Sequence, residues 1–309
     1  MIHRRAVLSL SLTLFAGAAA GAQQTSTPAF PSAPRVLERE VGGNEIAYID
    51  QGRGSTLVLI HGQFGDHLDW DPVLEPLAKR HRVIAVDLPG FGDSDKPERE
   101  YTGAFFVDTL SKLLKKLKVK HATFVGNSFG GQIAILYALR NSEQVDRLIL
   151  VDSGGFREFS EQEKEVTRQR FSETAVRALT PQIQQAMFAP VFARTSEIQR
   201  RYLDKQNAKL KRADYPAYAR VLPQTTLLSV STYLLNDLPK VSVPTLLLWG
   251  EQDRIVPPQL ARKALEQLPR GELKILPACG HSPQLDCPEE FLAAVGEFLE
   301  SVQNRKPLQ

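Results

Sequence analysis

Short apolar runs alternate with helical patterns along most of this chain. Runs such as STLVLIHG (55–62) are mostly apolar and end in glycine, which is typical of strands buried on both faces. Elsewhere the apolar residues recur every three or four positions, which is the spacing of an amphipathic helix. The predicted strands lie at 55–62, at the start of 82–97, and at 122–127, 145–155, 243–250 and 272–277. The predicted helices lie at 71–81, 101–118, 129–140, about 258–268 and 291–302.

This alternation predicts an α/β fold, with a mostly parallel sheet and helices on both faces. An antiparallel hairpin, VLEREV (36–41) and EIAYID (45–50) joined by two glycines, precedes it. The alternation stops at residues 156–239, which are charged and helical and lack any buried-strand pattern. We therefore predict a core at 36–155 and 240–303, interrupted by an all-helical insertion.

We expect the helical insertion to lie over the carboxyl ends of the strands. Open α/β sheets bind ligands beyond the carboxyl ends of their strands, and the insertion follows directly after one of those ends. We predict that it forms a lid over a binding site. An additional subdomain without such a role is the alternative.

The first residues form a different pattern. MIHRR is positively charged, AVLSLSLTLFAGAAA is apolar, and AGAQ supplies small residues at a cleavage position. This predicts a secretory signal peptide at residues 1–22, cut after Ala22, and an exported protein that is periplasmic or secreted. The run is short for a membrane span, which needs about 20 apolar residues, so a retained anchor is the alternative. Arg4 and Arg5 form a twin-arginine pair, which leaves the export route open. Residues 23–35 are polar and proline-rich and predict a flexible leader.

Composition and charge limit the classes of molecule that the protein is expected to bind. The chain is 24% charged with a formal net charge of only +3, and no long block of one sign stands out, so nothing indicates nucleic-acid binding. The two cysteines, Cys279 and Cys287, could pair in an oxidising compartment or simply be small buried residues; the sequence leaves both open. Their flanks show no metal-binding spacing. The oligomeric state is also open.

A candidate nucleophile lies in VGNSFGGQ (125–132), between a predicted strand and a predicted helix. Ser128 is the centre of a G-x-S-x-G pattern. A sharp turn from strand to helix forces the serine into an unfavourable backbone conformation, and glycine at each side avoids a clash. The hydroxyl then stands at a helix N-terminus, where free amides favour developing negative charge.

A serine nucleophile needs a base, and the chain has six histidines. His281 follows the last predicted strand, at the same end of the sheet as Ser128, and is the best candidate. His61 begins HGQFG and is better explained as holding that loop. The remaining histidines are His3 in the signal peptide and His67, His81 and His121, which we predict to be solvated surface residues.

The base needs an acid that orients it. Asp253 follows the strand at 243–250 and is favoured, while Asp152, which also follows a strand, is the alternative. Aspartates of the DLPGFGDSD loop are expected to form turns instead; they are Asp87, Asp93 and Asp95.

An oxyanion site completes the set. The glycines of HGQFG (61–65) allow close approach, so this loop is expected to present the backbone N–H of Gln63, with Phe64 as second choice. The N–H of Phe129, directly after Ser128, is the expected partner.

The motifs HGQFG, DLPGFGDSDKP, VGNSFGG, WGEQDRIVP and CGHSPQLDCPEEF resemble, in this order, the landmarks of the α/β-hydrolase superfamily. The resemblance covers about residues 36–302, and the order Ser128, Asp253, His281 matches the triad of that superfamily. The serine branch with helical caps includes small carboxylesterases and C–C bond hydrolases of ring-cleavage products. Haloalkane dehalogenases and epoxide hydrolases carry an aspartate at the position of Ser128 and are set aside.

The sequence thus predicts an exported serine hydrolase that acts on a small-molecule carboxylic ester through an acyl-enzyme. It needs no metal and no organic cofactor, and its mature chain has no stable membrane span. A C–C bond hydrolase is the alternative within enzymes. A ligand-binding or receptor protein on a hydrolase scaffold is the alternative from another class, since fold does not fix function. That protein would keep its ligand affinity after Ser128→Ala, whereas an enzyme would lose nearly all turnover.

Overall fold

The computed structural model describes residues 35–304. The predicted signal peptide (1–22) and nearly all of the predicted leader (23–35) lie outside the described residues. None of the described helices is long and apolar enough to cross a membrane.

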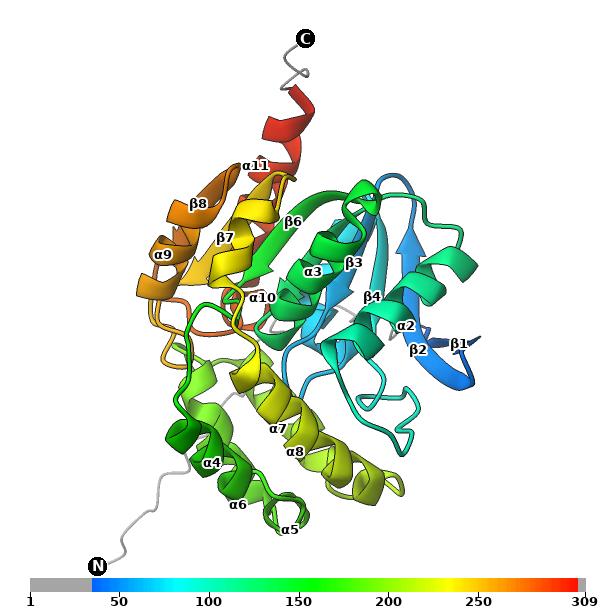
Figure 1. The fold of residues 1–309 in the computed structure, drawn as a ribbon, viewed down its shortest axis with the longest axis vertical. Coiled ribbons are helices and arrows are strands. Elements are labelled where there is room, and N and C mark those ends of the chain that lie inside the picture. Colours follow the sequence, from blue (N-terminus) through cyan, green and yellow to red (C-terminus); the bar gives the residue numbers. More distant parts are fainter. Residues whose placement is uncertain (1–34, 305–309) are drawn as a thin grey trace, which may run out of the picture. The chain divides into compact units, whose positions relative to one another are not determined.

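One mixed sheet of eight strands forms the centre of the fold, in the order β1-β2-β4-β3-β5-β6-β7-β8 (Figure 1). The hairpin β1/β2 is antiparallel, β2 pairs with β4 in antiparallel fashion, and all other pairs are parallel. The strands are β1 (Leu37–Val41), β2 (Asn44–Gly52), β3 (Thr56–Ile60), β4 (Arg82–Val86), β5 (Ala122–Asn127), β6 (Val145–Val151), β7 (Thr245–Gly250) and β8 (Gly271–Leu276).

Helices cover both faces of the sheet, because successive strand residues point to opposite sides. Ile60 and Phe124 pack in one apolar cluster with α2 (Gly103–Lys116), α3 (Phe129–Arg140) and α9 (Gln259–Gln267). Leu59 and Val125, their chain neighbours, pack in the opposite cluster with α1 (Asp71–Ala78) and α11 (Pro288–Asn304). Each face therefore carries a continuous apolar layer, and the predicted α/β fold is confirmed.

A helical insertion lies between β6 and β7, below the sheet in Figure 1. It contains α4 (Glu161–Arg170), α5 (Glu173–Arg177), α6 (Pro181–Phe188), η3 (Ala189–Val191), α7 (Glu197–Lys209) and α8 (Tyr215–Ser231). We call these helices the cap. The chain leaves the core and returns at one point, where Leu234 N–H donates to the carbonyl of Gly155 at 2.7 Å.

Ion pairs hold the cap to the core. Lys209 of α7 pairs with Asp66 at 2.7 Å, and both side chains are largely buried. The pairs Lys205–Asp71, Arg212–Asp93 and Lys96–Asp214 also join cap and core. In three of these pairs a basic residue of α7 or of the segment after it meets an acidic residue of the core, and in the Lys96–Asp214 pair the charges are reversed.

Four short elements complete the described chain, and the sequence patterns had not indicated them. They are η1 (His67–Trp70), η2 (Ser142–Gln144), η4 (Leu235–Lys240) and α10 (Pro283–Asp286). Two of these, η1 and α10, lie beside loops that carry candidate site residues.

Candidate active site

Ser128 occupies the turn between β5 and α3. Its φ of 53° and ψ of −113° form a strained conformation for a residue with a side chain. A Cβ at Gly126 would lie 2.4 Å from the carbonyl oxygen of Gly130, and one at Gly130 would lie 2.2 Å from that of Ile60. The two glycines are therefore required by backbone packing around the serine.

The turn leaves Ser128 at the N-terminus of α3. Its own carbonyl accepts the N–H groups of Gly131, Gln132 and Gly154. The residue is half-buried, unlike its neighbours Asn127 and Phe129, which are fully buried. Among the residues of this turn, Ser128 is accordingly the accessible one.

Asp253 and His281 form a buried pair. Asp253 Oδ2 and His281 Nδ1 are 2.8 Å apart, while Oδ1 accepts the N–H groups of Ile255 and Val256 at 2.7 and 2.9 Å. Burial favours the neutral acid, but the charge and hydrogen bond of His281 lower the pKa of Asp253. The acid is thus held as a carboxylate against the imidazole.

Asp152, the alternative acid, lies behind this pair. It is fully buried after β6, and its Oδ1 accepts the N–H of Gly250 at 2.9 Å. The hydrogen bond to the His281 ring comes from Asp253 instead. The strand order gives the reason, because β7 lies between β6 and β8, so the residues after β7 are nearer to His281.

Asn127 connects the nucleophile turn to the histidine loop. Its side-chain amide donates to the carbonyls of His281 at 3.0 Å and Val151 at 3.1 Å. The described structure contains no hydrogen bond between the Ser128 hydroxyl and the His281 ring. The two residues are neighbours through Asn127, which sequence reasoning had missed although it adjoins the serine.

The loop at 61–65 lies against the Ser128 turn. A Cβ at Gly62 would come within 3.4 Å of the Ser128 Cβ. The Gln63 side chain donates to the hydroxyls of Thr225 and Thr226 of α8 at 2.8 and 2.9 Å, so this loop is also tied to the cap. The loop is therefore packed between the Ser128 turn and the cap, while its role as an oxyanion site, through the Gln63 or Phe64 amide, stays a prediction.

His61 holds this loop from within. It is fully buried, burial lowers its pKa, and its Nε2 accepts the N–H of Leu88 at 3.1 Å. An acceptor nitrogen carries no proton, so the ring is neutral.

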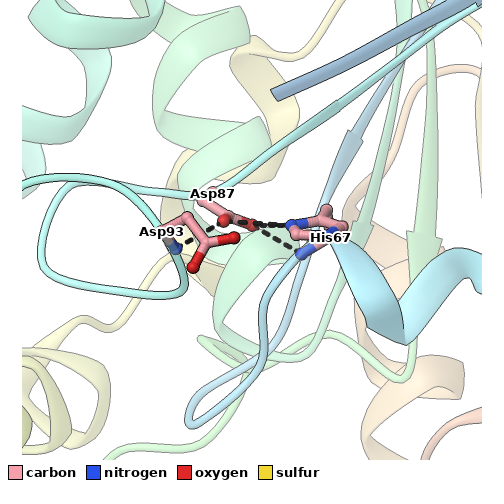
Figure 2. A group of neighbouring side chains, drawn as sticks. All are labelled: His67, Asp87 and Asp93. Atoms are coloured by element: carbon pink, nitrogen blue, oxygen red, sulfur yellow. Dashed lines mark hydrogen bonds and ion pairs between the residues drawn. The ribbon is translucent and has the colours of Figure 1, made fainter. Parts of the chain in front are cut away.

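His67 is buried, and its prediction as a solvated surface residue was wrong. Figure 2 shows its ring beside Asp87, whose two carboxylate oxygens each lie 3.0 Å from Nδ1. Burial alone would lower the pKa of His67, but the hydrogen bond and charge of Asp87 raise it to about 9. The error arises because the partner of His67 is Asp87, 20 residues further along the chain, which no local pattern reveals.

Two groups have the residue types of a metal site: His67, Asp87 and Asp93, and Asp152, Asp253 and His281. In the first group, Asp87 accepts hydrogen bonds from the main chains of His67 and Asp93 as well as from the His67 ring. In the second, Asp253 is bonded to the His281 ring and to two main-chain N–H groups. Because these carboxylates already have donors, we assign neither group as a metal site.

Asp286 is a second residue that sequence reasoning missed. From α10 it accepts the N–H groups of Gly280 at 2.7 Å, Ala193 at 2.8 Å and Arg194 at 3.2 Å. His281 N–H also donates to Val191 of the cap at 2.7 Å. The histidine loop is thereby joined to the segment between α6 and α7.

The α/β hydrolase fold family matches residues 55–288, which include the Ser128 turn and the Asp253–His281 pair. The chain belongs to the α/β-hydrolase family.

Characterised α/β-hydrolase relatives act on different substrates. The 2-hydroxy-6-oxo-6-(2'-aminophenyl)hexa-2,4-dienoic acid hydrolase of Metapseudomonas resinovorans is 31% identical, over 84% of this chain and 88% of that protein. The pimeloyl acyl-carrier-protein methyl ester esterase of Nitrosomonas europaea is 31% identical, over 78% and 94%. A bacterial membrane phospholipase A has a similar structure, with a TM-score of 0.75 and 32% identity over 88% of this chain and 87% of that one.

A disulfide closes the histidine loop of this α/β hydrolase. Cys279 and Cys287 are joined, and both are buried. The bond settles the question that the sequence left open, and it closes a short ring that contains His281.

Proposed function

We propose that the protein is an exported serine hydrolase that cleaves small to medium carboxylic esters. Ser128 attacks the ester carbonyl while His281 takes its proton and then passes it to the leaving alcohol. Asp253 orients the imidazole and stabilises its charged form. Water, deprotonated by His281, then releases the acid from the acyl-enzyme and restores the serine.

The observation that carries this proposal is the 2.8 Å hydrogen bond between Asp253 and His281 Nδ1. In this bond Nδ1 donates its proton to Asp253, so Nε2 of His281 is the nitrogen that acts as the base. Asn127 holds the main chain of His281 beside the serine turn, which supports a contact between the Ser128 hydroxyl and the imidazole in the substrate complex. Such contacts are often long without substrate and tighten when it binds.

Backbone amides supply the oxyanion site in this proposal. The N–H of Phe129 is the first of α3, and that of Gln63 belongs to the loop against the Ser128 turn. Each such donor contributes about 10²–10³ in rate, because it faces charge that develops only in the transition state.

The cap acts as a lid that sets substrate size and excludes water. Gln63 links the oxyanion loop to α8, and His281 links its own loop to η3. Movement of the cap is therefore coupled to both sides of the site and gates turnover.

Export is supported by the disulfide between Cys279 and Cys287, since such bonds persist in oxidising compartments. The signal-like pattern of residues 1–22 supports the same proposal.

A fluorophosphonate probe, followed by peptide mass spectrometry, tests the activated serine. We expect one adduct, on Ser128, which is absent in Ser128→Ala and forms far more slowly in His281→Ala. Ser111→Ala, on α2 and remote from the site, is the control and should label normally. A folded protein without an adduct would contradict the proposal and favour a ligand-binding protein.

A C–C bond hydrolase is the second candidate. GNSFGG is similar to the motif of those enzymes, and the relative from Metapseudomonas resinovorans hydrolyses a dienoic acid of this kind. The loop HGQFG favours esters, since C–C hydrolases carry a more glycine-rich, HGSGPG-like loop where this chain has Gln63 bonded to the cap. We expect higher kcat/KM for 4-nitrophenyl butyrate than for a 2-hydroxy-6-oxohexa-2,4-dienoate. The reverse order would establish the second candidate.

A further inference from the structure

Asp152 is a buried acid that the proposed mechanism does not use. One polar atom from each of Asp152, Asp253 and His281 lies within 4.8 Å of the other two. The Asp152 main chain has a φ of 45°, which residues with side chains rarely adopt. Strain of this kind persists only where the surroundings fix the residue, and it concentrates at functional sites.

An ionised Asp152 would not fit this environment. Its Oδ1 has a donor in Gly250, but its Oδ2 is buried without any hydrogen-bond partner among the described residues. A second negative charge would also lie beside Asp253, and two buried carboxylates in contact do not both ionise. A proton on Asp152 removes both difficulties, because the hydroxyl then donates to the Asp253 carboxylate. Burial, and then the charge of Asp253, raise the pKa of Asp152 well above its usual value, in agreement with this geometry.

We propose that Asp152 is a positioning residue that stays neutral and donates a hydrogen bond to Asp253, fixing the carboxylate that orients His281. The inference rests on the proposed function, because it gives the Asp253–His281 pair its catalytic role. With Asp152 as donor, Asp253 has four partners: Ile255, Val256, His281 and Asp152. The carboxylate then cannot rotate away from the imidazole.

A neutral Asp152 also weakens the negative charge that Asp253 presents to His281. The Asp253 carboxylate accepts a hydrogen bond from Asp152 and becomes less basic. It still stabilises the protonated His281 ring, but not so strongly that the ring fails to release its proton. Another charged group near the pair is Asp286 of α10, which raises the pKa of Asp152 further. Its oxygens accept the main-chain N–H groups of Gly280, Ala193 and Arg194.

The first test follows the titration of the His281 ring by NMR in the full chain with labelled histidine, assigned through His281→Gln. Asp152→Asn keeps a neutral donor to Asp253 and an acceptor for Gly250. We expect its titration midpoint to agree with wild type within about 0.3 pH unit. If Asp152 were ionised, this variant would remove a negative charge, and the midpoint would fall by about one unit or more. Such a fall, or an Asp152→Asn chain that does not fold, would overturn the proposal.

The second test removes the hydrogen bond. In Asp152→Ala we expect kcat to fall about tenfold with KM within about twofold, and the ascending limb of the pH profile to move to higher pH. Asp152→Asn should restore most of the rate. An Asp152→Ala enzyme with the wild-type kcat and pH profile would contradict the assignment. If no ester or C–C substrate is turned over, the proposed function fails, while the NMR titration still decides the protonation of Asp152.

Discussion

The side-chain amide of Asn127 donates to the main-chain carbonyl of His281 across 3.0 Å. It joins the residue before the candidate nucleophile to the candidate base. Asn127→Ala removes this bond and the one to Val151. Since each lost bond of a buried group costs about 1–3 kcal/mol, we expect lower stability and a kcat/KM reduced about tenfold or more. Urea unfolding and ester kinetics measure the two effects.

Asn141→Ala is the matched control. Asn141 lies at the other end of α3, and its side chain donates one long hydrogen bond, of 3.4 Å, to the carbonyl of Tyr137. We expect its kcat/KM to be close to wild type. Equal kinetic losses in both variants would mean that Asn127 supports the helix rather than the site.

The buried pair of Lys209 and Asp66 is the strongest candidate for a cap anchor. Burial would raise the pKa of Asp66, but Lys209 lowers it to about 2. Lys209→Met leaves Asp66 buried without its cation, so we expect the free energy of unfolding to fall by about 3–5 kcal/mol. Chemical denaturation measures the change.

Lys211→Met provides the comparison, because Lys211 is a neighbouring exposed lysine. Its effect should stay within about 0.5 kcal/mol, as for ordinary surface substitutions. Similar losses in the two variants would show that the buried pair does not anchor the cap.

His67 makes the stability of the protein depend on pH. Its pKa in the folded protein is raised to about 9, above the unfolded value of about 6.5. The folded state therefore binds the proton more tightly. The stabilisation is complete below about pH 6.5 and is lost as the pH rises through 9. Urea unfolding at several pH values should show this decline.

His67→Asn should flatten the decline between pH 6.5 and 9. Asp69, whose pKa is raised to about 8 by burial and then by the charge of Asp66, adds a decline in the same direction. This second contribution is common to both proteins, so the difference between their slopes reports His67. Identical slopes would rule out the His67–Asp87 ion pair.

The Cys279–Cys287 ring should stabilise the protein and keep the histidine loop in place. Replacing both cysteines by alanine frees a short loop, and the chain-entropy model gives a loss of about 2–3 kcal/mol. We expect lower thermal stability and a lower kcat. Dithiothreitol should reduce the stability of the wild-type chain and leave the double variant unchanged. Equal sensitivity of both proteins would exclude the disulfide as the cause.

Local patterns were enough to predict the alternating core and the helical insertion. The turn around Ser128 is specified within five residues, because the glycines on both sides are needed by the backbone itself. The sequence already favours Asp253 over Asp152 as the partner of His281, but the physical reason for this pairing is the strand order, which no local pattern contains.

The sequence patterns did not indicate features that depend on distant segments. His67 lies between Asp66 and Asp69 and looks exposed, yet its main chain and ring are bonded to Asp87, and its neighbour Asp66 pairs with Lys209 of the cap. Asn127 and Asp286 bond mainly to main-chain groups, and such partners leave no trace in residue types.

The single hydrogen bond between Leu234 and Gly155 has an evolutionary consequence. The cap is inserted between two residues that are in contact, Gly155 and Leu234. The length and sequence of the cap can therefore change without moving the strands of the sheet. Recombination at this point would exchange one set of helices for another and leave β6, β7 and the residues after them in register. A fold with such a junction can diversify its substrates by replacing a module while keeping its chemistry.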